Sequence, residues 1–153
     1  MMPEENKTPL PPSRREFMKR SAQGAFAAGF VYCTANSQSL SVTRLRIPVK
    51  GLPKEFAGFK IGFASDFHHG LAVPERTLET AVDMVNREKP DLILLGGDYV
   101  NISAQFMKSA FGILSGLRAP CGVCTVPGNH DHLARISNYA EAVSHTKMKD
   151  LTN

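Results

Sequence analysis

The sequence is poor in cysteine, and its one closely spaced pair, Cys121 and Cys124, has no second CxxC that could complete a zinc site. Both cysteines fall at the start of an expected strand, where residues i and i+3 point to opposite faces of a sheet. Thiols that diverge in this way are not placed to form a disulfide. We therefore interpret them as small core or edge residues, and redox or thiolate zinc chemistry is not favoured.

Clustered positive charge is absent from the body of the chain. Of 18 basic and 14 acidic residues, five basic and three acidic ones lie in residues 1–35, which leaves 13 and 11 for the remainder. These are spread without a basic stripe, so no nucleic-acid-binding patch is expected. With 153 residues, 42% of them hydrophobic, the chain has the size and apolar content of one globular domain.

The apolar stretch near the N-terminus is too short to span a membrane easily. Residues 21–33 are 13 uncharged residues, and a helix of that length spans about 20 Å where the hydrocarbon core measures about 30 Å. The stretch follows the basic sequence SRREFMKR (13–20), an order typical of an export signal. The pair Arg14-Arg15, in the context Ser-Arg-Arg-x-Phe, resembles the twin-arginine signal and so implies the twin-arginine export machinery as a partner.

This leader predicts three segments: a signal peptide over 1–35 with cleavage after Ala35, a linker over 36–43, and a domain over 44–153. Export by this route would place the protein in the periplasm or another extracytoplasmic space. The alternative is an uncleaved leader that remains as a membrane anchor. In that case the leader alone would contact the membrane.

Strand-like and helix-like segments alternate after the linker. Three short apolar runs, at 60–65, 91–97 and 122–127, suit strands buried on both faces, and 44–49 alternates as a further short strand. Helical patterns cover the following segments: 74–88, 103–117 and about 136–149. The alternation predicts an α/β fold with right-handed crossovers and a mainly parallel sheet.

A polar cluster follows each buried strand: DFHHG (66–70), GGDYVN (96–101) and PGNHD (127–131). Because the carboxyl ends of parallel strands meet at one edge, these side chains should converge there. The candidate site residues are Asp66, His68, Asp98, Asn129, His130 and Asp131. Carboxylates, imidazoles and an amide suit one or two divalent ions such as Mn, Fe or Zn. Two ions about 4 Å apart can activate water and hold a phosphoryl group for in-line displacement.

The order D-x-H, then G-D after a hydrophobic strand, then G-N-H-D resembles the calcineurin-like metallophosphoesterases. The segments NREKPDLILLGGDYVN and CGVCTVPGNHD are similar to the exported, single-domain bacterial phosphodiesterases of that family. The resemblance covers about residues 44–153. It implies an α/β fold of the metallophosphoesterase type, a β-sandwich flanked by helices, of which this chain holds mainly the first mixed or parallel sheet and its crossover helices.

The resemblance also implies a role for each candidate residue. Asp66 and His68 would bind a first metal ion, Asp98 would bridge both ions and Asn129 would bind the second. His130 would act on the phosphate or the leaving oxygen as a positioned donor, with Asp131 as its orienting partner. His69 and His132 lie beside these motif residues and are interpreted as rim residues, and His145 as solvated.

The sequence departs from the family in two ways. Asn101 stands where the family often has a second acid after G-D. The family's later His and G-H-x-H ligands are not found after Asp131, so we expect a truncated chain with about half of the domain. The resemblance implies a metal-dependent phosphoesterase that hydrolyses phosphodiesters or phosphomonoesters. The alternative is a noncatalytic fragment or a pseudoenzyme with residual metal binding. Residues 36–153 alone should be a poor enzyme, with apolar strand residues such as Ile93 and Leu95 or their neighbours exposed.

Overall fold

The three apolar runs form a parallel sheet with a fourth strand added at its edge. The computed structural model describes residues 40–153, and the strands follow one another in the order β1 (Ile61–Ala64), β2 (Leu92–Leu95), β3 (Val123–Thr125) and β4 (Lys149–Asp150). All three pairings are parallel, with Ile61 opposite Leu92, Ile93 opposite Val123, and Cys124 opposite Lys149. The expected parallel α/β fold is confirmed.

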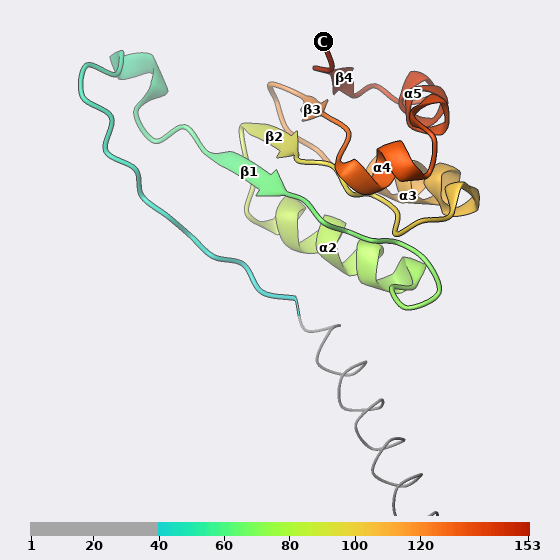
Figure 1. Cartoon of the computed structure of the whole chain (residues 1–153). Helices are drawn as coiled ribbons and strands as arrows, with labels where there is room; N and C mark the ends of the chain where they lie inside the picture. The colour runs from blue at the N-terminus through green and yellow to red at the C-terminus, as the bar shows by residue number, and fades with distance from the viewer. Residues whose placement is uncertain (1–39) are drawn as a thin grey trace, which may run out of the picture. The chain divides into compact units, whose positions relative to one another are not determined.

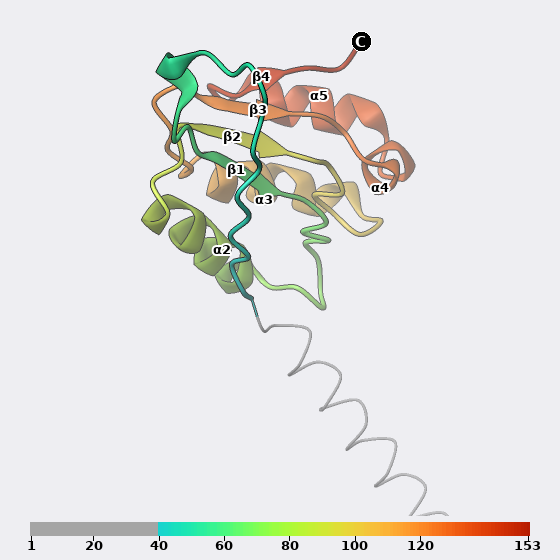
Figure 2. The same cartoon turned by 90° about the vertical axis from the view of Figure 1, so that its left-hand side faces the viewer.

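Helices connect the strands as crossovers. The helical elements are η1 (Lys54–Phe56), α2 (Glu75–Arg87), η2 (Ala104–Phe106), α3 (Met107–Leu114), α4 (Asn129–Leu133) and α5 (Ile136–Ser144). Helices α2, α3 and α5 lie on one face of the sheet, and Figure 2 looks onto the other face, with the strands in front of the helices (Figures 1 and 2). The sheet is thus covered by helices on one side.

The two faces of the strands differ sharply in burial. Ile93 and Leu95 of β2 are 0% and 2% exposed and belong to the core with Leu78, Phe111 and other helix residues. Of the strand residues expected to be exposed, Ile93 and Leu95 are therefore buried, whereas their neighbours Leu92 and Leu94 are half-buried. The exposed apolar side chains are those of β1, where Ile61 and Phe63 are 57% and 68% exposed. Alternation along a strand explains the difference, because a side chain faces either the helices or the opposite side.

Three further expectations about elements need correction. Residues 44–49 form no strand, because their backbone lies beside no partner strand; Leu45 and Ile47 are 79% and 77% exposed. The helix expected over 103–117 is a 3₁₀ turn followed by α3, and it ends at Leu114. The helix expected over 136–149 ends at Ser144, because the chain then turns to form β4.

The predicted signal peptide at 1–35, with its cleavage site and Arg14-Arg15, lies outside the described residues, as does the first part of the predicted linker. The described part, Leu40–Asn153, forms one unit. Within it, no helix has the length and apolar character needed to cross a bilayer.

Candidate metal centre

The loops that follow β1 and β2 run side by side beyond the ends of the strands. The N–H groups of Asp66, His68 and His69 donate to the carbonyls of Gly97, Asp98 and Tyr99 at 3.0, 2.9 and 2.9 Å. The parallel pairing of the sheet therefore continues into the loops. This backbone ladder places the D-x-H motif directly beside the G-D motif.

Three residues of these two loops have left-handed backbone conformations. The φ angles of Asp66, His68 and Asp98 are 58°, 45° and 56°. Such conformations cost a residue with a side chain about 1–3 kcal/mol, and they persist only where the surroundings impose them. Their concentration at the carboxyl ends of two strands is typical of a functional site.

The G-D and G-N-H-D loops approach each other through two glycines. A Cβ atom added at Gly97 would overlap the backbone of Gly128, and one added at Gly128 would overlap the Asp98 carboxylate. No side chain larger than hydrogen fits at either position without displacing backbone. The two glycines thus allow the loop after β3 to reach the loop after β2.

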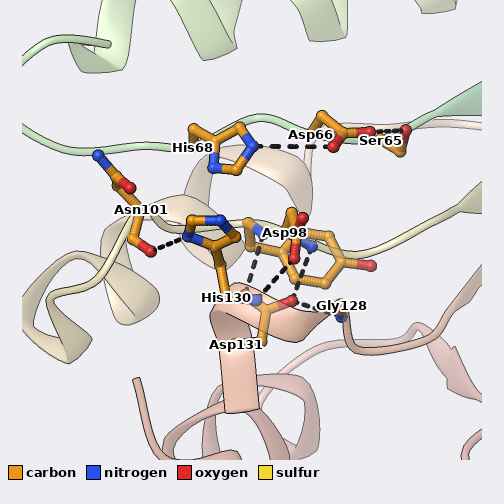
Figure 3. Close-up of polar contacts among 9 residues, drawn as sticks. Ser65, Asp66, His68, Asp98, Asn101, Gly128, His130 and Asp131 are labelled. Atoms are coloured by element: carbon orange, nitrogen blue, oxygen red, sulfur yellow. Dashed lines mark hydrogen bonds and ion pairs between the residues drawn. The ribbon is translucent and has the colours of Figure 1, made fainter. Parts of the chain in front are cut away.

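His68, Asp98 and His130 come together at this edge of the sheet. One ligand atom from each lies within 4.8 Å of those of the other two. The two imidazole rings meet edge to face with centroids 4.6 Å apart, beside Asp98 (Figure 3). Two nitrogen ligands and one carboxylate oxygen are a donor set that fits Mn, Fe or Zn. These three residues can therefore hold a divalent ion.

Asp66 lies beside His68 of this triad, and Asn129 directly precedes His130 in the chain. The Asp66 Oδ1 atom is 3.7 Å from Nε2 of His68, its Oδ2 accepts a hydrogen bond from Ser65, and its side chain is 65% exposed. Asn129 is exposed and is the first residue of α4. Of the four predicted metal ligands, the triad includes His68 and Asp98, and His130 joins them as the third member.

His130 is held by a backbone carbonyl. Its Nδ1 lies 2.5 Å from the carbonyl oxygen of Asn101 (Figure 3). A carbonyl can only accept, so Nδ1 carries the proton and Nε2 remains available to the site. The expected orienting partner, Asp131, contacts backbone N–H groups instead. Sequence patterns cannot reveal such a partner, because every residue type has a carbonyl.

Asp131 is fully buried, and its carboxylate binds the backbone of both neighbouring loops. Its Oδ2 accepts from the N–H groups of Asp98 and Gly128, each at 2.8 Å, and its Oδ1 accepts from that of Tyr99 at 3.0 Å. The Asp98 Oδ1 in turn accepts from the His130 N–H at 2.9 Å. Each of the two loops therefore supplies a carboxylate to the backbone of the other.

His69 is not a rim residue as expected. It is 2% exposed, its Nδ1 is 2.8 Å from the carbonyl of Val73, and its Nε2 is 2.8 Å from the hydroxyl of Ser109. It ties the loop after β1 to α3, because Nδ1 bonds Val73 within that loop and Nε2 bonds Ser109 of α3. His132 and His145 are exposed, as expected.

Tyr99 was missed by sequence reasoning. It is buried and stacks on Phe67, and its hydroxyl contacts Thr125 at 2.5 Å and the Val126 carbonyl at 3.1 Å. Burial raises the pKa of its phenol well above the usual range. Its position directly after Asp98 in the G-D motif could have indicated that it supports the backbone of that loop. Through these contacts, Tyr99 anchors the loop that carries Asp98 to the end of β3.

The calcineurin-like phosphoesterase family model matches residues 59–151. Phosphodiesterase YaeI of Escherichia coli is 38% identical over 126 residues, covering 78% of this chain and 44% of that protein. The metallophosphoesterase YkuE of Bacillus subtilis is 34% identical over 129 residues, covering 78% and 45%. A transmembrane protein with a metallophosphoesterase domain from Bos taurus is 30% identical over 118 residues, covering 76% and 27%. The chain spans less than half the length of these relatives, and no solved structure matches it.

Proposed function

This chain belongs to the calcineurin-like phosphoesterase family, and we propose that it forms the metal-binding half-site of a divalent-metal-dependent phosphoesterase. The observation that carries the proposal is the convergence of His68, Asp98 and His130 at the carboxyl ends of the strands. α/β proteins bind ligands at this edge. Divalent ions bound there would supply Lewis acidity toward a phosphoryl group and lower the pKa of water.

Several side chains of this chain would act together as metal ligands. His68, Asp98 and His130 would hold a first ion, and we propose that Asp66, beside His68, and Asn129, next to His130 in the chain, contribute further oxygen ligands so that two ions can bind. Mn, Fe and Zn all suit this mixture of nitrogen and oxygen donors. The neutral amide of Asn129 would add a ligand without adding negative charge that repels a phosphate ester.

His130 has two proposed uses, and its hydrogen bond favours both. Nδ1–H of His130 donates a hydrogen bond to the Asn101 carbonyl, so Nε2 is free of that contact. Nε2 can bind an ion or, when protonated, donate a hydrogen bond to an ester oxygen. The Asn101 carbonyl fixes the ring orientation in either case. Asn101 stands where the family often has an acidic residue. The hydrogen bond to His130 does not depend on this side chain, because the Asn101 backbone carbonyl accepts it.

Hydrolysis of aryl phosphate esters tests the proposal directly. The full-length protein that carries this chain, stripped of metal and reloaded with Mn, should hydrolyse an aryl phosphodiester or phosphomonoester. Asp98→Ala should abolish the activity, and Asp91→Ala, at the opposite end of the sheet, should retain it. Absence of Mn-dependent turnover in the wild-type protein would refute the enzyme proposal. Mn binding without turnover would favour a noncatalytic metal-binding protein.

A second test addresses residues 36–153 by themselves. We propose that this segment is a poor enzyme, because it offers few metal ligands and leaves Ile61 and Phe63 on an uncovered face. Loss of even one outer contact of a metal ligand costs about 10 to 100-fold in metal affinity. Turnover by the segment comparable with that of the full-length protein would contradict this.

We also propose export by the twin-arginine route, from the sequence around Arg14-Arg15. Fusing residues 1–40 to a folded reporter should carry the reporter across the membrane. Replacing both arginines with lysine should prevent this. Undiminished export of the lysine variant would refute the assignment.

A further inference from the structure

The buried carboxylate of Asp131 has a role that its place in the G-N-H-D motif does not reveal. Its two oxygens accept three backbone N–H groups, from Asp98, Tyr99 and Gly128, at 2.8 to 3.0 Å (Figure 3). We propose that Asp131 is a positioning residue that holds the backbone of Asp98 in its metal-binding conformation. This deepens the proposed function and rests on it.

The backbone of Asp98 needs such support. Its φ of 56° is unfavourable for a residue with a side chain, and it is persistent only where neighbouring groups impose it. Asp131 binds the N–H of Asp98 and the N–H of the next residue, so it holds the peptide groups on both sides of the Asp98 Cα. Rotation of Asp98 to an ordinary φ would break these contacts.

The three hydrogen bonds of the Asp131 carboxylate form a clamp, and a hydrogen bond to the Asp98 carboxylate answers it from the other loop. Asp98 Oδ1 accepts from the His130 N–H at 2.9 Å, so the backbone of α4 orients the Asp98 carboxylate. The same Asp131 carboxylate binds the Gly128 N–H at the start of α4. One buried residue therefore aligns two members of the triad, Asp98 and His130, on two different loops.

The decisive measurement is Mn affinity of the folded, metal-free protein, determined by the electron paramagnetic resonance signal of free Mn. Asp131→Asn in the full-length protein should lower Mn affinity by about 10 to 100-fold, the effect typical of losing a group that orients a ligand. The matched control is Asp91→Asn: the Asp91 carboxylate also accepts a backbone N–H across the sheet, from Lys60 at 2.7 Å, at the opposite end. Its Mn affinity should equal that of the wild type.

A merely structural role for Asp131 predicts a different result. It would lower the melting temperature of the Asn variant and leave Mn affinity unchanged at temperatures where circular dichroism shows the variant to be folded. Unchanged affinity under those conditions would overturn the proposal.

Hydrogen exchange of the wild-type protein provides a test that needs no variant. The Asp98, Tyr99 and Gly128 amides lie outside the strands, yet the clamp should protect them in metal-free protein as strongly as in Mn-loaded protein. Fast exchange of these amides without metal would show that the clamp is not preformed and would overturn the proposal. This readout also separates the two proposals, because it depends on the clamp even if the wild-type protein hydrolyses no ester.

Discussion

The two ends of the sheet differ in how their loops are held. At the carboxyl ends, Asp66, His68 and Asp98 adopt left-handed conformations and the loops interlock through buried contacts. At the amino ends, Lys89 and Gly122 also have positive φ angles, of 51° and 90°, but nothing lies within 4 Å of the position where a Cβ of Gly122 would be. An open groove lined by residues such as Arg118 and Lys147 borders this end. Left-handed backbone therefore occurs at both ends of the sheet, and the difference is that close packing of neighbouring loops is found where the metal ligands lie.

The carboxylates at the two ends show the same contrast. The Asp131 side chain is 0% exposed and accepts hydrogen bonds from three backbone N–H groups, whereas the carboxylate of the partly buried Asp91 accepts one, from the backbone N–H of Lys60. A buried N–H that loses its acceptor is costly, but one near the surface can turn to water. The carboxyl end should therefore be sensitive to small substitutions that the amino end tolerates.

The largest effect is expected from Gly97→Ala, compared with Gly122→Ala. Both glycines have φ near 90°, at 92° and 90°, so the backbone cost of alanine is shared, at about 1–2 kcal/mol. Only at Gly97 does the added methyl overlap the Gly128 backbone. We expect Gly97→Ala to lower the free energy of unfolding by about 4 kcal/mol or more. Urea unfolding of both variants measures the difference, and equal losses would contradict a tight contact between the two loops.

Next in size is Asp131→Ala, compared with Asp91→Ala. The first leaves three N–H groups without their acceptor and should cost about 3–5 kcal/mol, while the second should cost about 1 kcal/mol or less. Thermal unfolding of the metal-free proteins distinguishes these values. A similar loss for both variants would show that the carboxyl-end clamp contributes no more than a surface contact.

A smaller effect is expected at alkaline pH. Burial raises the pKa of Tyr139 to about 12, against an ordinary value of 10.0, and burial raises that of Tyr99 as well. The unfolded chain loses these protons first, so the stability they contribute is fully present below about pH 10 and is lost as pH rises toward 12. Urea unfolding between pH 8 and pH 11 should show the decline, and Tyr139→Phe should make it shallower. A decline unaltered by this substitution would contradict the assignment to Tyr139.

The smallest effect is expected from Arg44→Ala. Arg44 forms a two-pronged ion pair with Glu88 at 2.8 and 2.5 Å, and it lowers the pKa of that carboxyl, but its side chain is 73% exposed. Exposed pairs are screened by water and salt and contribute little. The melting temperature should be unchanged within error at physiological salt. A clear decrease would show that the segment around Arg44 is held more firmly than its exposure indicates.

Much of the fold could be predicted from periodicity. The apolar runs ending near Ala64, Leu95 and Thr125 predicted three parallel strands, and their polar continuations predicted the edge where His68, Asp98 and His130 meet. The strand expected at 44–49 was not found, because alternation shows only that a segment suits a sheet. Whether a partner strand lies beside it depends on the rest of the fold.

The contacts within the site could not be predicted in the same way. Asp131 was expected to hold the His130 ring, but the partner of that ring is the carbonyl of Asn101. His69 was expected at the rim of the site. It is buried instead, because its two ring nitrogens bond to the Val73 carbonyl and the Ser109 hydroxyl in the interior. Polar side chains go to whichever buried group needs a partner, and that depends on distances in space.

The sequence by itself determined the kinds of chemistry available and the edge at which they are gathered. The residue types Asp, His and Asn after three apolar runs were sufficient for this, because parallel strands all point the same way. Only the tertiary structure decided which groups touch. The close contact of Gly97 with Gly128 and the hydrogen bonds from backbone N–H groups to Asp131 join loops about 30 residues apart, and no local pattern encodes such a contact.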